Sequence, residues 1–150
     1  MTNALAATLL LLAQGIPWEG PNVSYGPDDL SRQTAYDGSR IEYLEATPRP
    51  GAAVAQGNPV EFKVRVRYTL QQAESGRLLV WFTGRSGELL DVEGLAVRIP
   101  RAVAAEQTVS VATRIPSSPS DLVLHVGVAA GDKQKAVRDL RIRYSVMKPR

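Results

Sequence analysis

The sequence of 150 residues contains no cysteine and a single histidine, His125. Without cysteine there can be no disulfide framework, no thiolate zinc site and no cysteine nucleophile, and one histidine excludes a histidine-rich metal cluster. A Ser-His-Asp constellation would have to use His125, yet no serine lies in a Gly-x-Ser-x-Gly elbow. We therefore expect no catalytic, cofactor-binding or metal-binding residues, no cofactor, and a protein that is not an enzyme.

Clustered positive charge is also scarce. The 18 Lys and Arg residues against 15 Asp and Glu give a net charge of +3, and 44% of the residues are hydrophobic, as in an ordinary soluble globular domain. Two short basic stripes occur, Lys63-Arg65-Arg67 and Arg141-Arg143, on strands that we expect in different sheets. Nucleic-acid binding needs clustered cations, so the sequence predicts no nucleic-acid partner.

The amino-terminal segment differs from the rest of the chain, because the first 31 residues contain no Lys or Arg and three acids. Residues 4–13 are apolar apart from one threonine and span about half the length needed to cross a bilayer, so we expect no transmembrane helix. Two interpretations of residues 1–15 stay open. They form a signal-peptide remnant, with Ala13-Gln14-Gly15 as the cleavage step, or an apolar helix capped by Asn3 and ended at Gly15.

Residues 16–40 are expected to form an extended linker, because residues 17–40 contain three Pro and three Gly without sustained periodicity. Four apolar side chains could anchor this segment on a domain: Trp18, Tyr25, Leu30 and Tyr36. Three aspartates could contribute oxygen ligands to a calcium site, but their spacing matches no calcium loop, which favours turn and cap formation. These aspartates are Asp28, Asp29 and Asp37.

Beyond residue 40 the dominant pattern has a period of two residues. In residues 60–69 every even position through Tyr68 is apolar and every odd position is polar or charged, which is typical of a strand buried on one face. The continuous apolar run at 78–82 indicates a strand covered on both faces. His125 falls on the face opposite Leu124, which predicts a solvent-facing histidine. Seven strands are expected in all, at residues 41–46, 60–69, 77–83, 95–99, 109–113, 122–128 and 140–147.

Seven short strands separated by turn residues predict an all-β fold, a seven-stranded antiparallel immunoglobulin-like β-sandwich at residues 41–150. Residues 41–147 resemble bacterial immunoglobulin-like modules of the cell-adhesion-related type, in which a Gly-x-Pro turn, here Gly57-Asn58-Pro59, precedes a long alternating second strand. The resemblance also implies that Trp81 is the core tryptophan of the third strand. It extends to the architecture only.

These observations predict a non-catalytic binding or structural module that is secreted or periplasmic. It would recognise a protein or cell-surface partner through loops at residues 84–87, 117–121 and 131–135. Two alternatives stay open. A subunit could dock into a larger complex by its amino-terminal helix, or the chain could be an accessory carbohydrate-binding domain using Trp18, Tyr25 and Tyr36. The second alternative draws on residues 6–17, which resemble the step before the last barrel strand of α-amylase-type glycoside hydrolases, although no catalytic residue carries over.

Overall fold

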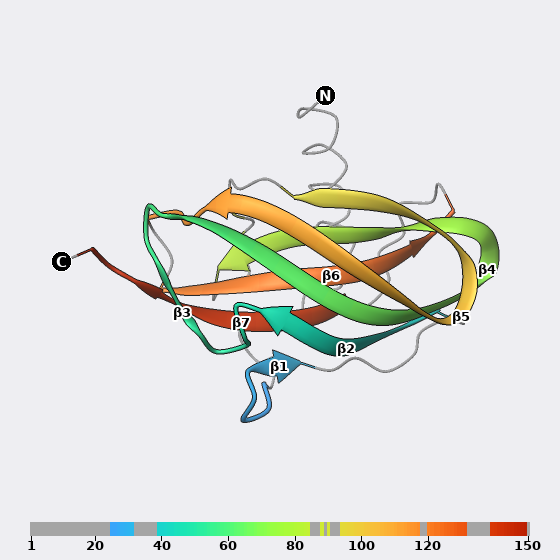
Figure 1. Cartoon of the computed structure of the whole chain (residues 1–150), viewed down its shortest axis with the longest axis horizontal. Helices are drawn as coiled ribbons and strands as arrows, with labels where there is room; N and C mark the ends of the chain where they lie inside the picture. Colours follow the sequence, from blue (N-terminus) through green and yellow to red (C-terminus); the bar gives the residue numbers. More distant parts are fainter. Residues whose placement is uncertain are drawn as a thin grey trace.

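The computed structural model describes residues 25–31, 39–84, 88, 90, 94–117, 120–131 and 139–149. These residues form seven β-strands, and no helix occurs among them (Figure 1). The apolar segment expected at residues 1–15 lies outside the described residues. The strands are β1 (Leu30–Ser31), β2 (Ser39–Thr47), β3 (Ala53–Ala55), β4 (Pro59–Gly84), β5 (Leu95–Arg114), β6 (Asp121–Ala130) and β7 (Asp139–Met147).

Two long strands, β4 and β5, each run through both layers of the fold. Residues 59–70 of β4 pair with β2 on one side and with residues 102–114 of β5 on the other, which makes the first layer. Residues 75–84 of β4 pair with residues 95–100 of β5 and with β6, which begins the second layer. In Figure 1 both strands curve around the same end of the molecule.

The second layer continues from β6 to β7, and the short strands β1 and β3 pair with β7. All pairings are antiparallel except that of β3 with β7, which is parallel and departs from the all-antiparallel expectation. The strand orders β2-β4-β5 and β5-β4-β6-β7 are those of an immunoglobulin-like sandwich, so the architectural resemblance is confirmed.

The core lies between the two layers, where the alternation expected from the sequence places it. Phe62 of the first layer is fully buried and contacts two rings of the second, Phe82 at a centroid distance of 5.3 Å and Tyr144 at 5.2 Å. The hydroxyl of Tyr144 donates a hydrogen bond of 2.7 Å to the Pro48 carbonyl, which ties β7 to the connection after β2. Aromatic contacts thus join the layers at the centre of the sandwich.

The seven strands expected from the sequence all occur, but four of them are the halves of β4 and β5. The expectation that turn residues separate the strands at 60–69 and 77–83 is wrong, because Glu74, Ser75 and Gly76 continue β4 through a register shift between Leu70 and Ser75. Gly76 permits this bend, since a Cβ atom there would lie 2.3 Å from the Ala129 carbonyl oxygen of β6.

Replacing Phe62 with alanine is expected to lower the free energy of unfolding by about 3–5 kcal/mol, because the cavity removes contacts with both layers. The neighbouring exposed residue supplies the control, and Lys63→Ala should change the unfolding free energy by less than about 0.5 kcal/mol. Urea denaturation followed by circular dichroism measures both. Equal losses for the two variants would contradict the assigned alternation.

Candidate functional site

The outer face of the second layer carries a group of buried polar residues. His125 points away from the core cluster, as its alternation with Leu124 predicts, but it is only 1% exposed. The expectation of a solvent-facing histidine is therefore wrong. Trp81 is also buried on this outer face and is not part of the core cluster, so the expectation of a core tryptophan is wrong as well. Leu79 and Val123 are buried beside them, which shows that both faces of this layer are covered.

Cross-strand pairing brings the polar residues of this face together. Trp81 of β4 lies opposite His125 of β6, which lies opposite Arg141 of β7. The indole and imidazole rings stack with centroids 4.9 Å apart and planes inclined by 9°. Gly127 leaves room for this arrangement, because a Cβ atom there would be 3.3 Å from the Trp81 ring.

A chain of hydrogen bonds links Thr83, His125, Asp139 and Arg141, which we call the buried polar network. The Thr83 hydroxyl lies 2.6 Å from Nε2 of His125, and Nδ1 of the same ring bonds the Asp139 carboxylate. Arg141 donates to both Asp139 oxygens, from Nε at 3.2 Å and from Nη2 at 3.4 Å. When Nδ1 carries the proton and donates it to Asp139, Nε2 accepts from the Thr83 hydroxyl.

The electrostatics of the network favour an ionised carboxylate. Burial alone raises the pKa of Asp139, but the charges and hydrogen bonds of His125 and Arg141 outweigh burial and hold the pKa below its usual value. Hydroxyl, imidazole and carboxylate follow one another here in the order of a nucleophile triad. All three side chains are buried, however, so a substrate cannot reach the Thr83 oxygen. The arrangement stabilises the covered face of the sheet.

An open hollow of about 420 Å³ lies where the segment before β1 meets the connection between β2 and β3. Arg143 of β7 holds the first segment in place, because its Nε and Nη2 donate to Oδ1 of Asp29 at 2.9 and 2.5 Å. Asp29 has a φ of 59° and Gly51 a φ of 82°, so both walls are tight turns. The hollow is lined by Asp28, Asp29, Leu30, Tyr43, Arg49, Pro50 and Gly51.

Most sequence-predicted binding positions fall outside the described residues. This applies to Trp18, Tyr36 and Asp37, and to most of the loops at 84–87 and 131–135 and part of the loop at 117–121. Tyr25 is described and half-buried, and the Arg143 guanidinium lies 4.9 Å from its ring centre. Among the described residues no three metal-ligating side chains come together, so Asp28 and Asp29 do not form part of such a group there.

The two basic stripes differ in their surroundings. Lys63 and Arg65 are exposed on the first layer and Arg67 is half-buried there, and each lies within 4 Å of a glutamate on the same or an adjacent strand. In the second stripe Arg141 is buried in the polar network and is only 2% exposed, so it does not form part of a basic surface. Asp139, two residues before Arg141 and on the same face, is the sequence signal that could have indicated a buried ion pair. The stripes lie in different layers, as expected.

Comparison with known proteins yields no matching family model and no matching curated protein. Solved structures resemble the chain at low sequence identity. A CARDB domain from Pyrococcus furiosus is 14% identical with a TM-score of 0.47, over 77% of this chain and 100% of that one. The Calx CBD1 domain is 9% identical with a TM-score of 0.40, over 76% of this chain and 100% of that one. A β-glucosidase from Listeria innocua is 12% identical with a TM-score of 0.44, over 74% of this chain and 16% of that one. These similarities concern the fold alone.

Within the described part of the chain, no helix has the length and apolar character needed to cross a membrane.

The low pKa of Asp139 predicts a pH-dependent contribution to stability. Asp139→Asn removes the ionised partner of His125 and Arg141, and should lower the unfolding free energy near neutral pH by about 3–5 kcal/mol. Because the folded pKa lies below the usual value of 3.8, this contribution is complete above pH 3.8 and disappears as the pH falls through the folded pKa. Denaturation at a series of pH values measures the difference between the two proteins.

Glu74→Gln changes an exposed carboxylate and serves as the matched control, with an expected effect below about 0.5 kcal/mol. A difference between wild type and Asp139→Asn that stays constant down to the lowest pH would contradict the charged network.

Proposed function

We propose that this chain is a non-catalytic β-sandwich module that recognises a protein or cell-surface partner through connections at the rim of its layers. The observation that carries the proposal is the contrast between two sets of polar residues. The buried polar network has the groups for chemistry but no access for a substrate, whereas the hollow beside β1 opens to solvent. Recognition on such a scaffold is therefore best placed at the rim.

The lining of the hollow supports a polypeptide partner. It combines the carboxylate of Asp28, the guanidinium of Arg49 and the phenol ring of Tyr43. Side chains of both charge signs beside an aromatic ring suit the mixed chemistry of a protein surface better than a uniformly anionic polymer. Lys63, Arg65 and Arg67 of the first layer also argue against a nucleic-acid partner, because nearby glutamates neutralise their charges.

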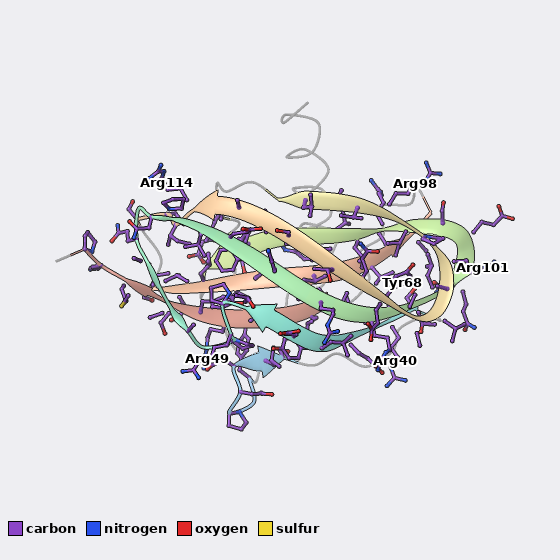
Figure 2. All side chains as sticks on the ribbon, viewed as in Figure 1. Arg40, Arg49, Tyr68, Arg98, Arg101 and Arg114 are labelled. Atoms are coloured by element: carbon purple, nitrogen blue, oxygen red, sulfur yellow. The ribbon has the colours of Figure 1, made fainter. Side chains whose placement is uncertain are left out.

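Binding through the hollow predicts a local effect of charge reversal at Arg49. Purified chain labelled with a fluorophore is expected to bind saturably to the surface of the cells that produce it. Arg49→Glu should raise the dissociation constant at least about tenfold, because it reverses the only cation among the described residues of the lining. The matched control is Arg98→Glu, an exposed arginine near the other end of the molecule (Figure 2), which should bind like the wild type.

Three results would contradict this function. The first is the absence of saturable binding, and the second is an equal loss in Arg49→Glu and Arg98→Glu. The third is turnover of a chromogenic ester that disappears in a folded Thr83→Val variant, which would make the buried polar network catalytic. Binding to a glycan array that is lost in Trp18→Ala would instead support the accessory carbohydrate-binding alternative.

We further propose that the module acts outside the cytoplasm, on the basis of the apolar run at residues 4–13 followed by Ala13-Gln14-Gly15. Cleavage after this small-x-small step predicts a mature chain that begins at Ile16. Amino-terminal sequencing of protein isolated from the native cell measures this directly. A mature chain that begins at Met1 or Thr2 would remove the argument for export and favour the docking-helix alternative.

A further inference from the structure

Strand β5 leaves one side of its backbone without a partner strand among the described residues, since it pairs with β4 alone. In Figure 1 the first half of β5 runs along the outline of the molecule, and its second half crosses the view diagonally beside β4. In its second half the side chains alternate between the two faces of the sheet. Val109 and Val111 are buried in the core, whereas Thr108, Ser110 and Ala112 are exposed.

The hydrogen bonds of Ile115, the residue after β5, show which N–H and C=O groups of the strand point toward β4 and which point outward. Ile115 donates its N–H to the Asn58 carbonyl at 3.0 Å and accepts from the Gly57 N–H at 2.9 Å, so its backbone groups face the β4 side. Backbone groups alternate along a regular strand, so in residues 106–114 of β5 the odd-numbered residues face β4 and the even-numbered residues face outward. The Thr108 carbonyl agrees, because it accepts the side-chain amide of Gln107 at 3.2 Å.

This edge lacks the features that usually prevent strand addition, which are charges, proline and bulges. Residues 107–113 contain no charged residue, no proline and no glycine. The other long edges have such features. The edge strand β2 carries Arg40 and a register shift between Tyr43 and Glu45, and the first half of β5 carries Arg98 and Pro100. An unprotected edge of seven residues, between protected ones, indicates a place where a strand is added.

We propose that two copies of this chain pair through residues 106–114 of β5, antiparallel about a two-fold axis at Ser110. In this register Ser110 lies opposite Ser110 of the second copy, and both residues present outward-facing backbone groups. The interface would form about ten backbone hydrogen bonds and make one continuous sheet from the two first layers. Val109 then lies opposite Val111 on the core side of the joined sheet.

Charge complementarity selects both the partner and the register. With the axis at Ser110, Glu106 of each copy lies opposite Arg114 of the other, on the solvent-facing side of the sheet. Moving the axis by two residues in either direction places both charges opposite uncharged residues. Within one copy Glu106 lies 3.4 Å from Arg67, an exposed ion pair that can rearrange at little cost. Strand, register and charges are therefore consistent with a second copy of the same chain.

Analytical ultracentrifugation of the purified chain over a range of concentrations tests the proposal. We expect a concentration-dependent monomer–dimer equilibrium. Ser110→Lys places two like charges at the axis and should raise the dimer dissociation constant at least about tenfold, whereas Ser110→Thr keeps a strand-forming side chain there and should leave it unchanged. A chain that stays monomeric at all concentrations, or Ser110→Lys dimers as strong as those of the wild type, would overturn the proposal.

A charge exchange tests the register separately. Glu106→Arg and Arg114→Glu each place like charges opposite one another twice in the dimer, and each should weaken dimerisation about tenfold. The double variant restores both pairs and should dimerise like the wild type. Because Glu106, Ser110 and Arg114 are all exposed, thermal unfolding should show that every variant remains folded. Failure of the double variant to recover dimerisation would reject the axis at Ser110.

Discussion

The structure depends on one constraint, that the even-numbered side chains of β4 form the interior in both layers. Phe62, Val64 and Val66 fill the first layer, and Leu78, Val80 and Phe82 fill the second, all with the same parity. A strand that continues from one layer into the other keeps the same face inside only when no residue is gained or lost at the bend. The bend at residues 71–74 keeps the even-numbered positions inside, although β4 is shifted in register against β5 between Leu70 and Ser75. The two layers are thereby placed face to face by a single continuous strand.

Burial of the opposite face of the second layer makes the polar network necessary. The odd-numbered residues of β4 in this layer, such as Trp81 and Thr83, are as well covered as the core residues. A charged residue on such a face is costly unless it is paired, and here Asp139 joins His125 to Arg141. The same groups in a solvent-filled cleft would suggest catalysis, so it is their covering that assigns them a structural role.

The sequence contains enough to predict the strand segments of β2, β4, β5, β6 and β7 and the residues of their core faces, because these depend on local alternation. It did not indicate the short strands β1 and β3. The sequence also indicates that β4 is one strand. After the polar residues Gln72 and Glu74, apolar residues occur again at even-numbered positions from Leu78 onward. Turn-forming Ser75 and Gly76 obscured it, because glycine serves close approach to β6 here and not a turn. The burial of His125 was missed for a different reason. Alternation states which face a residue occupies but not whether another part of the molecule covers that face.

The proposed dimer is compatible with partner binding at the rim, because the two use opposite edges of the first layer. In the first layer β2 and β5 are the two edges, and the hollow lies on the β2 side, where Tyr43 contributes to its lining. Pairing of two copies through β5 therefore leaves both hollows open, at opposite sides of the joined sheet. Two weak sites held in one rigid body bind a repetitive surface more strongly than either site alone, because the second contact forms at a high effective concentration. A small module with a shallow site gains strength in this way without a larger interface, which suits recognition of a surface that presents many copies of one partner.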